Sequence, residues 1–190
     1  MIAVRRANYA DLKGLAALHR QSWVDSHGDI FPAWYVAERP FAFFHGLWEA
    51  FLDDDQRPVL VAVSQSGLQG FVRYGRLGLT SGSHGMRLGE IHTIYVSPNT
   101  QGRGIGSVLL AHAEQGLASA GWNNAVLSVS AQRTSAIRFY KYHGWSRQGD
   151  EYLAEFEGVR LPFVTMRKDL EFTKYVGTQV MVSAGAKPSM

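Results

Sequence analysis

The feature that most constrains the fold is a glycine-rich loop, Gln101-Gly102-Arg103-Gly104-Ile105-Gly106-Ser107, between two apolar segments of different periodicity. The preceding segment, 88–97 (LGEIHTIYVS), is typical of a strand, whereas 105–120 has apolar residues at helical spacing. Three glycines in five residues let backbone N–H groups approach a ligand, and the helix adds partial positive charge at its N-terminus. The loop therefore predicts a phosphate or pyrophosphate site in a strand–loop–helix unit.

Two familiar nucleotide-binding motifs do not fit this loop. A P-loop requires Gly-Lys-Ser/Thr after its fourth spacer residue, and no stretch of the sequence matches it. A dinucleotide fingerprint counted from Gly102 needs glycine at the position that holds Ser107, and no acidic residue ends the next strand at Ser130. The phosphate ligand is therefore of another kind.

The rest of the chain alternates between strand and helix patterns. Turn and helix-cap residues bound these segments, and Pro40 splits the aromatic-rich segment 32–52. The order predicts an α/β (α+β) fold, with a mixed central sheet of about seven strands, flanking helices and a right-handed parallel crossover around 105–120. We expect one domain over 1–170 and a flexible tail over 171–190. Strands are predicted at 2–7, 58–64, 69–77, 88–97, 125–130, 145–156 and 159–167, helices at 8–23, 32–52, 105–120 and 134–143, a turn at 26–29 and a loop at 78–85.

Composition narrows the function classes. The chain has no cysteine, which excludes a disulfide framework, a thiolate metal site and a cysteine nucleophile. No apolar run approaches the ~18 residues of a membrane span, and the N-terminus lacks the pattern of a secretory signal, so we expect a cytoplasmic protein without a membrane partner. The net charge of +3 comes from dispersed basic residues, which argues against a nucleic-acid partner. No Gly-x-Ser-x-Gly elbow supports a serine hydrolase.

Two motifs carry a resemblance to a known family. Gln101, Gly104 and Gly106 fill the pattern Gln/Arg-x-x-Gly-x-Gly/Ala. A later helix carries Ala-x-x-Phe-Tyr, with Phe139 and Tyr140, and is followed by glycine and an aromatic residue. In this order and on these elements, the chain resembles the GNAT superfamily of N-acetyltransferases over roughly residues 2–169.

The resemblance implies acetyl-CoA as the co-substrate, bound where the strand before the loop and the strand after the helix separate. Backbone groups of Ile94, Tyr95 and Val96 are expected to hold the pantetheine arm. The 101–107 loop, with Arg103, is expected to hold the pyrophosphate. Arg133 stands where members often carry asparagine, so it either meets a CoA phosphate or is simply exposed. No metal is expected, because no third ligand accompanies Glu90 and His92.

The implied reaction is acetyl transfer from a thioester to an amine. Glu90 and His92 lie two residues apart on one strand, so they are expected to share a face, which Ile94 would continue. The family places bases at these two positions, and either residue would serve as the base here. Tyr140 matches the family's frequent general acid and, with an ordinary pKa near ~10, is protonated at neutral pH. Alternatively, Glu90 and His92 are merely polar residues near a sheet end, and Tyr140 is an aromatic residue packed on the buried face of its helix.

The acceptor stays open between a small-molecule amine and a peptide amine, and a homodimer is possible. Trp23, His27, Trp34 and Tyr35 lie where relatives build part of the acceptor site, although helix packing is the favoured interpretation of these aromatics. Two alternative functions remain: a transferase of another acyl-CoA, and a CoA-binding sensor without catalysis.

Overall fold

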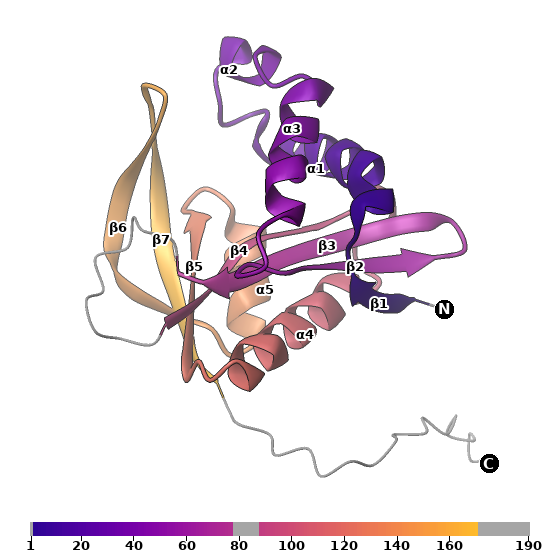
Figure 1. Cartoon of the computed structure of the whole chain (residues 1–190). Coiled ribbons are helices and arrows are strands. Elements are labelled where there is room, and N and C mark those ends of the chain that lie inside the picture. The colour runs from indigo at the N-terminus through magenta and orange to yellow at the C-terminus, as the bar shows by residue number, and fades with distance from the viewer. Residues whose placement is uncertain (1, 78–87, 171–190) are drawn as a thin grey trace, which may run out of the picture.

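The computed structural model describes residues 2–77 and 88–170, which form one seven-stranded mixed sheet. The strand order is β1-β2-β3-β4-β5-β7-β6 (Figure 1), and the predicted fold class is confirmed. Neighbouring strands pair antiparallel, except β4 and β5, which pair in parallel. The strands are β1 (Ala3–Arg6), β2 (Val59–Ser64), β3 (Gly67–Arg76), β4 (Leu88–Val96), β5 (Asn124–Ser130), β6 (Ser146–Phe156) and β7 (Val159–Asp169).

The helices cover both faces of the sheet. In Figure 1, α1, α2 and α3 lie above the sheet and α4 lies below it. The helix predicted over 32–52 is split at Pro40 into α2 and α3, as expected, because proline cannot donate the backbone hydrogen bond that a continuous helix needs. The helices are α1 (Leu12–His27), α2 (Ala33–Ala37), α3 (Phe41–Leu52), α4 (Ile105–Ser119) and α5 (Thr134–Tyr142), with short 3₁₀ turns at Tyr9–Asp11 and Pro98–Thr100.

The first helical segment starts at the predicted cap but ends later than predicted. The Asn8 side chain accepts a hydrogen bond from the Ala10 N–H at 2.9 Å, and the Asp11 carboxylate accepts one from the Asn8 N–H at 3.0 Å, which forms a capping box. The helix then runs past Trp23 to His27, so the turn predicted at 26–29 is wrong in its first two residues. Trp23 and His27 stack four residues apart, with ring centroids at 6.0 Å, which supports this extra turn.

Two hydrophobic cores fill the space between the sheet and its helices. On one face, Leu109 and Leu117 of α4 pack on Val72 of β3 and Met166 of β7. On the other face, α1 and α3 pack on Val61 and Phe71, with Trp48 fully buried. Adjacent residues of β3 thus enter opposite cores, as strand alternation requires. The sheet is therefore covered by a hydrophobic core on each face.

A bulge in β4 changes which side chains share a face. Tyr74 of β3 pairs with Ile91 and Arg73 pairs with Thr93, so His92 is an extra residue without a partner in β3. Ile91 and Ile94 consequently both pack in the core beneath α4, whereas Tyr95 packs toward α1. The prediction that Ile94 continues the face of Glu90 and His92 is wrong, because the bulge reverses the alternation after His92.

Two predicted segments cannot be compared with the structure. The loop at 78–85 and the tail at 171–190 lie outside the described residues. Within the part of the chain that is described, no helix is long and apolar enough to cross a membrane.

Candidate active site

The central pair of parallel strands separates after three residues. Pairing between β4 and β5 covers only Leu88, Glu90 and the residue between them, with Glu90 opposite Val126 as the last pair. From there β5 continues alongside β7, while β4 continues alongside β3 as far as Val96. Within residues 2–77 and 88–170, the β5-side edge of the predicted pantetheine-binding residues Ile94, Tyr95 and Val96 therefore has no strand partner, although Gln101 Nε2 approaches the Val96 carbonyl at 3.4 Å.

The glycine loop leaves the start of α4 accessible. Gly102 and Gly104 have φ of 75° and 77°, and a Cβ at either position would meet no atom within 4 Å. Gly104 caps α4 without a side-chain hydrogen bond to the first-turn N–H groups. Those N–H groups and the helix dipole favour an anion at this end of the helix.

Two further residues of the loop face α5 rather than solvent. A Cβ on Gly106 would lie 3.4 Å from Cζ of Phe139, so this glycine lets α4 approach α5 closely. Ser107 Oγ lies 2.9 Å from His143 Nε2, at the C-terminal end of α5. Sequence reasoning did not single out His143, because only the packing of α5 against α4 brings it to the loop.

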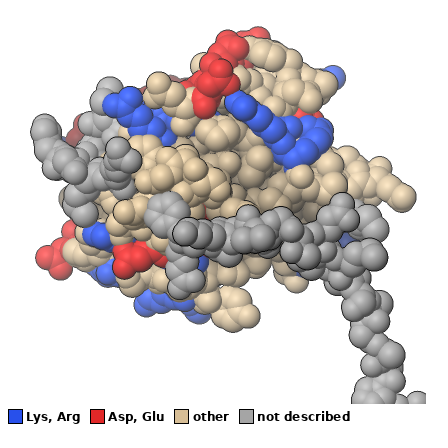
Figure 2. Space-filling view, turned by 60° about the horizontal axis from the view of Figure 1, so that its bottom comes forward, with Lys and Arg blue, Asp and Glu red and all other residues tan. Residues whose placement is uncertain are grey.

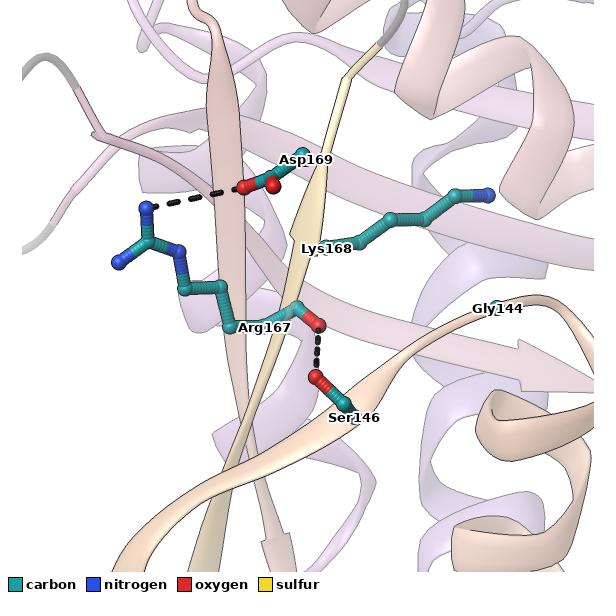
Figure 3. Close-up of a pocket in the computed structure, with 5 residues that line it drawn as sticks. All are labelled: Gly144, Ser146, Arg167, Lys168 and Asp169. Carbon is teal, nitrogen blue, oxygen red and sulfur yellow. Dashed lines mark hydrogen bonds and ion pairs between the residues drawn. The ribbon is translucent and has the colours of Figure 1, made fainter.

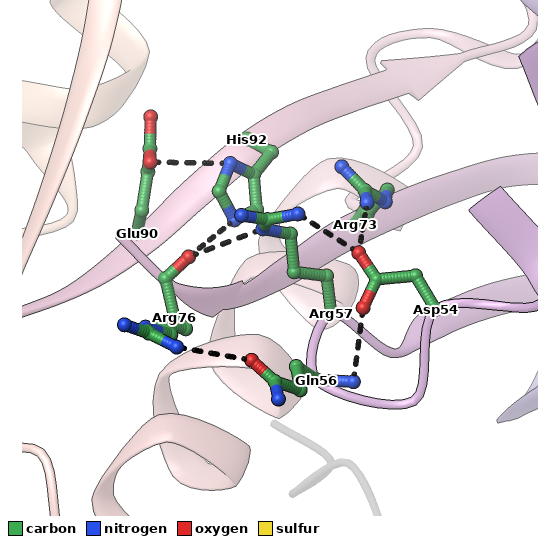
Figure 4. A network of polar contacts seen from close by, with 7 residues as sticks. All are labelled: Asp54, Gln56, Arg57, Arg73, Arg76, Glu90 and His92. Atoms are coloured by element: carbon green, nitrogen blue, oxygen red, sulfur yellow. Dashed lines mark hydrogen bonds and ion pairs between the residues drawn. The ribbon is translucent and has the colours of Figure 1, made fainter. Parts of the chain in front are cut away.

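Glu90 and His92 lie together on the α1–α3 side of the sheet, where β4 leaves β5 (Figure 4). Glu90 Oε2 is 3.2 Å from His92 Nδ1, and His92 Nε2 is 3.0 Å from the carbonyl oxygen of Arg76. Because a carbonyl only accepts, Nε2 carries a proton in this arrangement, and Nδ1 faces the carboxylate. We call this pair the Glu90–His92 dyad; it can take up one proton between Nδ1 and Oε2.

A cluster of charged residues flanks the dyad, and sequence reasoning missed it. Asp54 Oδ2 accepts from Arg57 at 2.9 Å and from Arg73 at 2.8 Å. Burial acts to raise the pKa of Asp54, but the hydrogen bonds and charges of the two guanidinium groups outweigh it and leave this pKa lowered. Burial lowers the pKa of Arg73, whereas the negative charges of Asp54 and Glu90 act to raise it.

Tyr140 lies buried on α5, with its ring against Phe139 and Trp145. Burial raises the pKa of the Tyr140 phenol above its ordinary value, so the hydroxyl stays protonated throughout the neutral range. Burial also raises the pKa of Tyr95, with a smaller contribution from Tyr140 and an opposing one from Arg133. The Tyr140 phenol of α5 therefore acts electrostatically on the Tyr95 phenol of β4.

Arg133 is partly buried and pairs with another residue of the chain. Its Nη2 pairs with Oδ1 of Asp29 in the loop after α1, and its side chain is 22% exposed. The hydrogen bond from Arg133 lowers the pKa of Asp29. Burial lowers the pKa of nearby His27 to about 4, and the charge of Arg133 adds to this effect. The pair therefore joins the loop after α1 to the start of α5.

The aromatic residues considered for the acceptor site divide between packing and exposure. Tyr35 is buried, stacks on Phe31 at 4.4 Å between ring centroids, and packs with Trp23 and residues of the β6–β7 hairpin. His27 lies 6.4 Å from the Tyr95 ring, whereas Trp34 is half exposed. Packing thus accounts for Trp23 and Tyr35, and His27 is the one of the four that contacts β4.

The surface contains a hollow of about 450 Å³ between the segment that leads into β6 and the end of β7 (Figure 3). It is lined by residues at the start of β6 and the end of β7, including Lys168 and Arg167. Both cations already have partners, since Lys168 Nζ lies 2.7 Å from Glu114 and Arg167 bonds Asn124 at the start of β5. Its position and its paired charges make it unsuitable for the predicted phosphate ligand.

Charge on the described surface is dispersed. On the face shown in Figure 2, basic and acidic side chains form separate small groups among uncharged residues. Within residues 2–77 and 88–170, no group of three or more histidine or acidic side chains is placed to hold a metal ion.

Comparison with known proteins identifies the class to which this fold and site belong. The model of the acetyltransferase (GNAT) family matches residues 20–145, more than half of the chain. The chain therefore belongs to the acetyltransferase (GNAT) family, whose members are acetyl-CoA-dependent acyltransferases.

Individual relatives agree with this assignment. The uncharacterized N-acetyltransferase YuaI of Bacillus subtilis is 28% identical over 162 residues, which cover 85% of this chain and 89% of YuaI. The N-acetyltransferase structure from Staphylococcus aureus Mu50 has a TM-score of 0.71 at 17% identity, covering 90% of this chain and 99% of that one. The PaiA N-acetyltransferase of Thermoplasma acidophilum, solved with coenzyme A, has a TM-score of 0.65 at 20% identity, covering 89% and 99%.

Proposed function

We propose that the protein transfers an acetyl group from acetyl-CoA to a primary amine of a small molecule or peptide by direct attack of the amine. The observation that carries this proposal is the position of the Glu90–His92 dyad at the last pair between β4 and β5. An acid–base pair at the point of strand separation, on the strand that leads into the open glycine loop, suits proton removal next to a bound thioester. The PaiA N-acetyltransferase, a structural neighbour, was solved in complex with coenzyme A, which supports a coenzyme A thioester as the acetyl donor.

The residues present fit coenzyme A. The pyrophosphate would lie at the start of α4, where Gly102 and Gly104 leave open space and the first-turn N–H groups lack a side-chain cap. Exposed Arg103 adds a cation beside it, and Gln101, Ile105, Gly106 and Ser107 complete the loop. The unpaired edge of Ile94–Val96 would accept the amides of the pantetheine arm. Bound there, acetyl-CoA supplies an activated acyl group.

The dyad would act on the acceptor. A primary amine has a pKa near ~10 and is protonated at neutral pH, so it must lose a proton before it attacks. Glu90 Oε2 and His92 Nδ1 face each other and would take up that proton between them, with the imidazole oriented by the Arg76 carbonyl. A general base in such a position typically contributes on the order of 10²–10⁴-fold.

Tyr140 would act on the leaving group. A thiolate leaves more easily when it receives a proton, and a phenol that stays protonated through the neutral range can supply one. Arg133, already paired with Asp29, would either keep that pair or exchange it for a cofactor phosphate.

The test is release of free thiol from acetyl-CoA in the presence of a panel of amines, with the acetylated product identified by mass spectrometry. We expect at least one primary amine to give product with the wild-type chain and turnover lower by about 10²-fold or more in Glu90→Gln. Thiol release that does not depend on any amine would overturn the proposal.

A further inference from the structure

Three charged residues that have no part in the family motifs flank the Glu90–His92 dyad. They are Asp54 and Arg57, from the turn after α3, and Arg73 of β3, which we call the Asp54 cluster (Figure 4). We propose that the Asp54 cluster is a positioning group that orients His92 and sets the proton affinity of the Glu90–His92 dyad. This inference rests on the proposed function, in which the dyad is the base.

Close backbone packing brings the cluster to the dyad. Gly75 of β3 pairs with Glu90, and a Cβ on Gly75 would lie 2.3 Å from the Gln56 carbonyl oxygen and 2.9 Å from Arg57 Cα. Its φ of +146° also disfavours any other residue. Only glycine therefore lets the turn after α3 lie against β3 at the residue that faces Glu90.

One carbonyl oxygen joins the cluster to the imidazole. The Arg76 carbonyl accepts from His92 Nε2 at 3.0 Å and from Arg57 Nε at 3.4 Å. Arg57 is in turn held by Asp54, which also accepts from the Gln56 N–H at 3.1 Å. The carbonyl thus has a fixed orientation, and the imidazole that donates to it keeps Nδ1 directed at Glu90.

The charge of the cluster is unbalanced and partly shielded from water. Asp54 neutralises one of two arginines, so one positive charge remains beside the dyad. Arg73 is only 8% exposed, lies over the Phe51 ring at 3.9 Å, and has a buried Nε without a hydrogen-bond partner. Figure 4 shows one more charged side chain beside the Asp54 cluster and the dyad, that of Arg76, whose guanidinium lies 3.4 Å from Gln56 Oε1.

The sign of the effect follows from the charge alone. A neighbouring cation disfavours uptake of a proton, whether that proton resides on Glu90 or on His92. Removal of the Arg73 charge therefore raises the proton affinity of the dyad. Removal of the Asp54 charge leaves two unopposed arginines and lowers it. A group that served only to stabilise the fold would not shift the titration in opposite directions.

The test is an NMR titration of the His92 ring in the intact chain, without acetyl-CoA or acceptor. The His92 signal is assigned among the seven histidines by its loss in His92→Ala. We expect the midpoint to rise by about half a pH unit or more in Arg73→Gln, to fall by a similar amount in Asp54→Asn, and to stay in place in Arg73→Lys, which keeps the charge.

A matched control removes an arginine–aspartate pair elsewhere in the chain. Arg5 pairs with Asp11 at 2.7 Å near β1, and Arg5→Gln should leave the His92 midpoint unchanged. An unchanged midpoint in both Arg73→Gln and Asp54→Asn, or shifts of the same sign, would overturn the inference. Because the titration needs no turnover, this failure is distinct from failure of the acetyl-transfer assay. If Arg73→Gln does not fold, the other two variants test the inference: the His92 midpoint should fall in Asp54→Asn and stay unchanged in Arg73→Lys.

Discussion

Substitution of Gly104 by alanine should lower stability, because the backbone there is left-handed. It should also weaken cofactor binding, because the new Cβ would occupy space next to the cofactor. At φ of 77°, an L-residue pays about 1–2 kcal/mol to adopt the left-handed conformation. A Cβ there meets no protein atom within 4 Å, so no steric cost is added. For a domain of this size, 1 kcal/mol changes Tm by roughly 2–4 °C. Gly104→Ala should therefore lower Tm by about 2–8 °C without ligand.

The same substitution should weaken coenzyme A binding, because the open space above Gly104 is where the pyrophosphate would lie. A ligand at 100 times its Kd stabilises a fold by ~2.7 kcal/mol, and a tenfold weaker Kd removes about half of that. Thermal unfolding with and without coenzyme A measures both effects on one sample. Gly158→Ala is the matched control, because Gly158 in the β6–β7 turn also has a positive φ, +87°, and a Cβ there meets no atom within 4 Å; it should lower Tm and leave the shift on coenzyme A unchanged. A Gly104→Ala variant with the wild-type Tm and the wild-type shift on coenzyme A would refute the reasoning.

Three further predictions concern single side chains. Tyr140→Phe should slow turnover by roughly 10²-fold with little change in coenzyme A affinity, as kinetics and calorimetry would measure; wild-type turnover would remove its acid role. Glu90→Gln should depress turnover chiefly on the acidic side of the pH–rate profile, and if it is silent while His92→Ala is not, the proton path runs through His92. Burial lowers the pKa of His19 to about 3, so the unfolded chain takes up a proton below pH ~6.5 while the folded chain does not. Unfolding free energy should therefore fall by about 1.4 kcal/mol per pH unit between pH 6 and 4 on account of His19, and urea denaturation of His19→Leu should lack that contribution.

Local patterns were sufficient to predict most of the fold. Alternating apolar residues marked the strands, and Pro40 and the Asn8 cap marked helix boundaries that the structure confirms. The glycine loop was found from sequence because its function needs a short, contiguous backbone segment at a helix start. Its φ angles at Gly102 and Gly104 are those that only glycine adopts readily.

Contacts between distant segments could not be predicted in the same way. The bulge at His92 adds one residue to β4 relative to β3, and no local signal distinguishes it from a regular strand. The partners of Asp54 and Arg133 are 19 and 104 residues away, at Arg73 and Asp29. Such pairs depend on the packing of α3 and of the loop after α1, which composition and periodicity do not specify.

We propose that acetyl transfer takes place where β4 and β5 separate, beside the Glu90–His92 dyad. The most direct measurement is the rate of acetyl-CoA thiol release with an accepted amine, compared between wild type and the Glu90→Gln and His92→Ala variants at matched cofactor saturation. We predict that both variants bind coenzyme A as the wild type does and that at least Glu90→Gln loses about 10²-fold or more in turnover. Wild-type turnover in both variants would contradict the account.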